Sequence, residues 1–178
     1  MRLKILSLAI LSIFAVTYAC GDNDDDDNTQ QKPSDPAVAG IPQVCQDAFA
    51  RRYPKARRVK WEIKKPYYVA DFADVNGTVD TEAWFKADGT WTMSEADFGK
   101  DLFMIPTAVN LAFEKTEYRT WTISDISHYT YPDQTREFYV IEVEKTGSAD
   151  TDLYFRADGT LFKTAPDTGT DITPDTAV

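Results

Sequence analysis

The stretch Trp84-Phe85-Lys86-Ala87-Asp88-Gly89-Thr90 decides the fold, because it occurs a second time as Tyr154-Phe155-Arg156-Ala157-Asp158-Gly159-Thr160. In both stretches an aromatic pair leads into Asp-Gly, which is a strong signal for a tight turn between antiparallel strands. Two upstream motifs also recur in the same order: Ile41-Pro42 as Ile105-Pro106, and Trp61-Glu62-Ile63 as Trp121-Thr122-Ile123. The chain is therefore predicted to contain two copies of one structural unit.

Each copy predicts one helix followed by four strands. A proline, which the first turn of a helix tolerates, precedes apolar residues at helical spacing in both copies. Alternation of apolar and polar residues then indicates strands at 58–63, 68–72, 79–85 and 90–93, and in the second copy at 119–123, 138–144, 152–155 and 160–163. Residues 124–134 are expected to form an elongated hairpin. The predicted fold class is α+β, with two repeats of one helix packed on a four-stranded antiparallel sheet, at residues 41–100 and 101–165.

The N-terminal residues 1–19 have the pattern of a bacterial lipoprotein signal peptide. Basic residues precede the apolar run 5–16, which is too short for a comfortable membrane span, and Thr17-Tyr18-Ala19-Cys20 follows as a lipobox-like ending. We expect cleavage before Cys20 and lipidation of its thiol, and several acyl chains together anchor a protein stably. The alternative is an ordinary secreted protein in which Cys20 is incidental.

Both ends of the chain are predicted to lie outside the folded body. Residues 20–40 are expected to be a disordered tether, because four consecutive aspartates at 24–27 and a Gln/Pro/Ser/Ala-rich segment bury little apolar surface. The acidic run resembles the surface-export signal of lipoproteins from Bacteroidetes-type bacteria, which implies an outer-membrane lipoprotein exposed on the cell surface. A solvated spacer and a periplasm-facing anchor remain alternatives. Residues 166–178, rich in Thr and Pro, are expected to form a flexible tail.

Charge is concentrated at these two ends. The whole chain carries a formal charge of −10, yet residues 41–165 contain 20 acidic and 16 basic residues. Nucleic-acid-binding domains are usually strongly basic, so this composition argues against nucleic-acid binding.

The duplicated motifs carry a family resemblance. The Ile-Pro helix, the Val-x-Trp-x-Ile strand at 59–63 and the aromatic-Phe-x-Ala-Asp-Gly-Thr hairpin, occurring behind a lipobox, resemble tandem PepSY-like domains of the beta-lactamase-inhibitor-like group. This resemblance covers about residues 41–165 and implies a non-enzymatic exported protein that binds another protein through a sheet surface. The secreted inhibitor that gives the group its name is similar to a disulfide-stapled pair of domains. Because this body contains only Cys45, inhibition of a beta-lactamase is not carried over.

The sequence predicts no catalytic residue, no metal site and no cofactor. The only histidine, His128, has no Cys or Glu at metal-ligand spacing and is interpreted as a solvated loop residue. The acidic segments lack the Asp-x-Asp-x-Asp-Gly loop of a calcium site. Cys45 lies one helical turn before Phe49 and is expected to be a buried core residue, with an intermolecular disulfide as the alternative. We therefore expect a protein that is not an enzyme.

Two surfaces are candidates for binding. Strand alternation sends aromatic and aliphatic side chains to the face opposite the helices, where charged residues surround them, and aromatic and arginine side chains dominate binding hot spots. These candidates, expected to be exposed, are Tyr67, Val69, Trp84, Lys86, Phe138, Val140, Tyr154 and Arg156. A basic run could instead attract an anionic partner, and its residues are Arg51, Arg52, Lys55, Arg57, Arg58, Lys60, Lys64 and Lys65.

The expected partner is another exported protein or peptide of unknown identity, and inhibition of that partner is one form that this binding can take. A surface carbohydrate-binding or structural lipoprotein is the alternative, since exposed tryptophans stack on sugar rings. The only contact with a membrane is expected through the lipid anchor.

Overall fold

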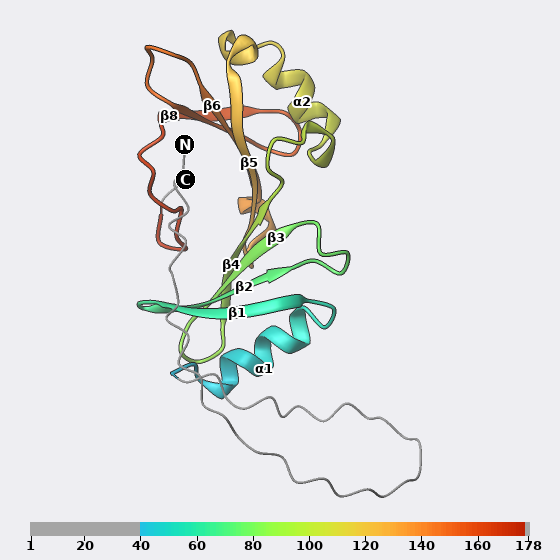
Figure 1. The fold of residues 1–178 in the computed structure, drawn as a ribbon, viewed down its shortest axis with the longest axis vertical. Helices are drawn as coiled ribbons and strands as arrows, with labels where there is room; N and C mark the ends of the chain where they lie inside the picture. The colour runs from blue at the N-terminus through green and yellow to red at the C-terminus, as the bar shows by residue number, and fades with distance from the viewer. Residues whose placement is uncertain (1–39, 177–178) are drawn as a thin grey trace, which may run out of the picture.

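The computed structural model describes residues 40–176, which form a single antiparallel sheet of eight strands with two helices (Figure 1). The first half contains α1 (Gln43–Arg52), β1 (Arg57–Lys64), β2 (Tyr67–Ala73), β3 (Asp80–Phe85) and β4 (Trp91–Asp97). The second half contains α2 (Thr107–Phe113), β5 (Thr122–Thr130), β6 (Phe138–Glu144), β7 (Thr151–Phe155) and β8 (Leu161–Pro166). Short 3-10 turns, η1 (Leu102–Met104), η2 (Glu117–Thr120) and η3 (Gln134–Arg136), complete the structure.

The predicted signal peptide, Cys20 and the tether lie outside these described residues. Within 40–176, no helix combines the length and the apolar character needed to cross a bilayer.

The helix-plus-antiparallel-sheet architecture was predicted, but the prediction of two separate four-stranded sheets is wrong. The strands follow one another in chain order from β1 to β8, and β4 pairs with β5 from Ser94 opposite Thr130 to Asp97 opposite Ser127. An exposed strand edge presents unpaired N–H and C=O groups. Joining β4 to β5 satisfies two such edges, so that only β1 and β8 remain as edges of the sheet.

The predicted hairpin turns have the same geometry in both halves and bring the sheet against each helix. The Lys86 N–H donates to the Thr90 carbonyl at 2.9 Å, and the Arg156 N–H donates to the Thr160 carbonyl at 2.9 Å. The glycines of both turns have positive φ angles, +81° at Gly89 and +88° at Gly159. A Cβ at Gly159 would lie 2.5 Å from the Ala108 carbonyl oxygen in α2, so only glycine allows this close approach.

The second half differs from its prediction at β5. A strand was expected only at 119–123, with a hairpin at 124–134, whereas β5 continues to Thr130 and pairs along its length with β6. The polar residues Ser124, Asp125, Ser127 and His128 gave this segment the composition of a loop. Several of them are accommodated by side-chain partners, as when Ser127 Oγ donates to Glu95 Oε1 at 3.0 Å.

Each helix covers its own apolar cluster on the same side of the sheet. Under α1, Cys45 and Phe49 pack with Ala70, Phe72 and Phe85, and the Phe49 and Phe72 rings are 5.1 Å apart. Under α2, Val109 and Phe113 belong to a second cluster, whose other buried members are Ile105, Ile126, Tyr139, Ile141, Val143, Leu153 and Phe155. Cys45 is buried, as predicted, and its Sγ lies 3.1 Å from the Lys86 carbonyl oxygen.

Candidate functional site

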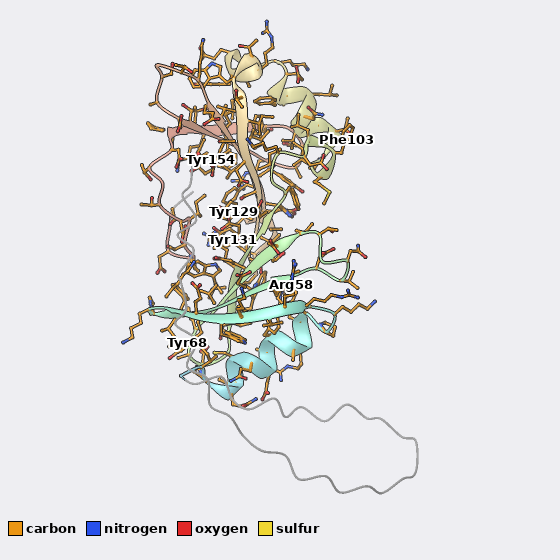
Figure 2. The ribbon with its side chains drawn as sticks, in the orientation of Figure 1. Arg58, Tyr68, Phe103, Tyr129, Tyr131 and Tyr154 are labelled. Atoms are coloured by element: carbon orange, nitrogen blue, oxygen red, sulfur yellow. The ribbon has the colours of Figure 1, made fainter. Side chains whose placement is uncertain are left out.

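The strongest candidate site is the side of the sheet that faces away from both helices. Successive side chains of a strand point to opposite faces, so the residues between those of the helix-side clusters gather there. We call the following group of buried sheet and strand-end residues the aromatic face: Tyr67, Val69, Trp84, Met93, Tyr129, Tyr131, Phe138, Val140 and Tyr154. All six apolar candidates from the sequence belong to it. Figure 2 shows Tyr129, Tyr131 and Tyr154 on this side and Phe103 on the helix side.

The rings of the aromatic face pack in two groups, one on β2 and β3 and the other on β5 to β8. Tyr67 and Trp84 meet edge to face with centroids 5.9 Å apart. Tyr129 stacks on Phe138 at 5.0 Å with an interplanar angle of 17°, and Phe138 lies 6.0 Å from Tyr154. Phe162 of β8 packs edge-on against Phe138 at 6.1 Å. Aromatic pairs bury a large apolar area and also favour particular ring orientations, so they fix how these side chains pack.

The prediction that this face is exposed is wrong, because the chain itself covers it. Residues 167–176, which we call the C-terminal segment, run back along this side of the sheet (Figure 1). Ile172 is only 4% exposed and belongs to the same cluster as the aromatic face. The segment was predicted to be a flexible tail because its composition is polar, yet Ile172, its one aliphatic residue, packs into the cluster.

Two polar contacts hold the C-terminal segment at the β1–β2 end of the face. Lys64 Nζ lies 3.3 Å from Asp171 Oδ2, and Tyr67 Oη donates to Asp175 Oδ1 at 2.8 Å. Lys64 also lies 3.2 Å from Glu82 Oε1. Burial by itself lowers the pKa of Lys64, but the charges of Glu82 and Asp171 outweigh it, so the pKa is raised. Burial and the bond to Asp175 raise the pKa of Tyr67 to about 12.

The aromatic face contains two buried donors without an acceptor. Within residues 40–176, neither Trp84 Nε1 nor Tyr131 Oη has a hydrogen-bond partner. Trp84 is 2% exposed and Tyr131 is 4% exposed. A buried donor that lacks an acceptor is costly and rare in folded proteins. The C-terminal segment therefore covers this face without satisfying all of its polar groups.

Three carboxylates at the other end of this side could hold a cation. Oxygens of Glu142, Asp152 and Asp167 lie within 4.8 Å of one another. Glu142 and Asp152 are buried and directly opposite each other on β6 and β7. Oxygen ligands of this kind suit calcium or magnesium. No metal site was expected from the sequence, because the three residues come from separate segments without a loop motif. Val140 and Glu142 are two residues apart on β6 and therefore share a face of the sheet, as do Tyr154 and Asp152 on β7. This alternation was the sequence signal that could have placed Glu142 and Asp152 together.

Of the other two residues predicted for this surface, Arg156 lies beside it and Lys86 lies in a turn on the helix side. The Arg156 guanidinium lies 4.2 Å from the centre of the Phe162 ring and donates to the carbonyls of Thr135 and Glu137. The Lys86 backbone belongs to the turn that contacts α1. Exposed apolar side chains occur elsewhere, most clearly Phe103, which is 97% exposed.

The predicted basic run is spread over the end of α1, the following turn, β1 and, at Lys65, the turn after β1. The Arg52 guanidinium lies 3.3 Å from the centre of the Trp91 ring, and Arg58 pairs with Asp80 at 3.2 Å. Lys64 is directed to the aromatic face, where it contacts Glu82 and Asp171. Since β1 is an edge strand, its charges also oppose pairing with another chain.

His128 is not the solvated loop residue that was predicted. It lies in β5, its ring stacks on Tyr139 with centroids 4.3 Å apart, and its Nε2 is 2.7 Å from Glu137 Oε1. Burial lowers the pKa of His128, and the bond and charge of Glu137 oppose that effect only in part.

Comparison with known proteins identifies related folds. The sequence model of the family described as "Putative beta-lactamase-inhibitor-like, PepSY-like" matches residues 66–163. A BLIP-like protein from Bacteroides fragilis is 34% identical over 77% of this chain and 94% of its own, with a TM-score of 0.68. A DUF2874 family protein from Bacteroides ovatus is 28% identical, covering 72% and 89%, with a TM-score of 0.66.

A third solved structure, titled a putative periplasmic protein from Bacteroides eggerthii, is 29% identical over 71% of this chain and 88% of its own. Its TM-score is 0.64. No curated protein matches the chain.

Proposed function

Because the chain belongs to the putative beta-lactamase-inhibitor-like, PepSY-like family, we propose that it is a non-enzymatic cell-envelope protein that binds an extended segment of another exported protein on its aromatic face. The observation that carries this proposal is that the C-terminal segment already lies on that face. An extended segment lies on it with one aliphatic side chain buried and two carboxylates bound. A surface that accepts one such segment has the shape and chemistry to accept another.

The envelope location rests on the N-terminal pattern and on the periplasmic description of the relative from Bacteroides eggerthii. Lipidation of Cys20 is part of this proposal. A Cys20→Ser variant should leave the membrane fraction and fail to take up a labelled fatty acid. If that variant stays in the membrane fraction as fully as the parent protein, the anchor lies elsewhere.

Photo-cross-linking at two phenylalanine positions tests partner binding. Benzoyl-phenylalanine at Phe162, which packs against the aromatic face, should give a discrete adduct in the native cell envelope. The same group at the fully exposed Phe103 is the matched control and should not give that adduct. Equal adducts at both positions, or none at Phe162, would contradict the proposal. An inhibitory role predicts that the captured protein is an enzyme whose activity falls on adding the chain.

Charge reversal gives a second control for the same experiment. Lys64→Glu places a negative charge where carboxylates bind, so the Phe162 adduct should fall about tenfold or more. Lys55→Glu reverses a charge in the turn before β1 and should leave the yield of the Phe162 adduct unchanged.

The carbohydrate alternative has less support, since no tryptophan within 40–176 is exposed. Binding on a glycan array, with no protein adduct, would favour it instead.

A further inference from the structure

We propose that the C-terminal segment is a built-in competitor for the aromatic face, and that the natural partner presents a segment of the same chemistry. This inference rests on the proposed function and adds the class of ligand to it. The ligand is an extended stretch with an aliphatic side chain, one carboxylate directly before it and another three residues after it. In this chain the pattern is Asp171-Ile172-Thr173-Pro174-Asp175.

The geometry of the bound segment supports this ligand class. Ile172 enters the aromatic cluster, while Asp171 and Asp175 reach Lys64 and Tyr67 at the same end of the sheet. A segment with basic residues at the two flanking positions would meet the Lys64 ammonium and leave the Tyr67 hydroxyl without its acceptor. The opposite end of this side carries Glu142 and Asp152 beside the segment's own Asp167, so the cation that favours a ligand carboxylate is Lys64 at the β1–β2 end.

The C-terminal segment is attached in a way that permits release. It lies beyond β8 and forms no strand of its own. Among the described residues, its hydrogen bonds to the rest of the chain between 168 and 176 are those of Asp171 and Asp175, and the others are internal, such as Thr173 N–H to Thr176 Oγ1. The Asp167 N–H donates to the Asp150 carbonyl at 2.8 Å, and beyond it one buried side chain and two polar contacts oppose the entropy gained on freeing residues 168–176.

A partner can bind more tightly than the C-terminal segment by using donors that the segment leaves unsatisfied. Trp84 Nε1 and Tyr131 Oη lie buried on the aromatic face without an acceptor in the part of the chain that the structure describes. Carbonyl or carboxylate oxygens of an incoming segment could accept from both. Satisfying buried donors that are already desolvated favours the complex over the self-bound state.

The test uses the full chain and a synthetic peptide with the sequence of residues 167–176. Ile172→Asp places a charge in the aromatic cluster and should release the segment. Thr170→Asp adds the same charge at an exposed position two residues away and is the control. The labelled peptide should bind the Ile172→Asp chain about tenfold or more tightly than the parent or control chain, because the intramolecular competitor is gone. Circular dichroism checks that the variant keeps its sheet.

Two further measurements make the result decisive. A peptide with lysine at both aspartate positions that flank the isoleucine should bind the Ile172→Asp chain at least about tenfold more weakly. Equal binding of both peptides, or no binding of either, overturns the ligand class. In the unmodified chain, excess peptide should accelerate amide exchange in residues 167–176, and unchanged exchange overturns the competition.

The Phe162 adduct separates this inference from the proposed function. If the C-terminal segment competes with the partner, the adduct should increase several-fold in the Ile172→Asp chain but not in the Thr170→Asp chain. An adduct of equal yield in all three chains leaves partner binding intact and overturns the competitor. Peptide binding without any adduct leaves the segment as a self-contact and overturns the partner.

Discussion

At the scale of single residues, polar groups within the sheet depend on particular neighbours. Ser127 reaches Glu95, and Trp91 Nε1 donates to Ser94 Oγ at 2.8 Å. His128 combines a ring stack on Tyr139 with its contact to Glu137. Because burial outweighs Glu137 and lowers the pKa of His128, the folded state favours the neutral imidazole.

His128 should make the fold less stable in mild acid. Its folded-state pKa lies below its value in the unfolded chain, so the unfolded chain takes up a proton first as the pH falls below about 6.5, and the free energy of unfolding decreases. A His128→Gln variant keeps a polar group near Glu137 but does not titrate. Urea unfolding at about pH 7.5 and about pH 5.5 should therefore show a smaller loss of stability for the variant. If the free energy of unfolding falls equally in both proteins, His128 is not the cause of the lower stability in acid.

At the scale of elements, each Asp-Gly hairpin both reverses the chain and contacts a helix. Gly159 meets the Ala108 carbonyl of α2, and Gly89 meets the Val44 carbonyl of α1. The duplicated hairpin motif thus positions helix and sheet in both halves. Gly147 has a similar φ of +83° but would have nothing within 4 Å of an added Cβ.

The pair Gly159→Ala and Gly147→Ala should separate backbone strain from a helix clash. Both variants place alanine at a positive φ, which costs about 1–2 kcal/mol. Only Gly159→Ala also pushes a methyl group against backbone of α2, so its free energy of unfolding should fall by roughly 1–3 kcal/mol more. Urea titrations of both proteins measure the difference. If the two variants are equally stable, the turn does not press against α2 as described.

The sequence predicted elements well where a local pattern repeats and poorly where partners are distant. The hairpins around Asp88 and Asp158 and the facing of Trp84 and Tyr154 followed from turn chemistry and alternation. β5 was predicted only at its start and missed beyond Ile123, because the polar residues that follow find partners only after the sheet forms. The packing of the C-terminal segment on the aromatic face was also missed. Only one of its apolar side chains, Ile172, is buried there, and a single residue gives no periodic pattern in the sequence.

At the scale of the whole molecule, pairing between β4 and β5 makes the two halves one body. The sheet runs without interruption from β1 to β8. The C-terminal segment reinforces this union, because it starts after β8 in the second half and ends in contact with Lys64 and Tyr67 in the first. The two halves are therefore expected to unfold together.

Phe49→Ala should lower the stability of both halves. Phe49 lies in α1 and contacts the rings of Trp61, Phe72 and Phe85, so its truncation should cost about 3–5 kcal/mol. Amide exchange under mild urea should then show faster opening of β6 as well as β2. Phe103→Ala removes a fully exposed ring and should change stability by less than about 0.5 kcal/mol. Faster exchange confined to residues 43–97 would indicate two independent domains.

The position of the C-terminal segment also bears on how the protein is handled. An affinity tag or reporter fused directly after residue 178 would extend a stretch that contributes Ile172 to the interior and Asp175 to a hydrogen bond. Bulk attached there would pull on that stretch and could free it. A carboxyl-terminal fusion would then report on an opened molecule, with a ligand preference different from that of the natural polypeptide.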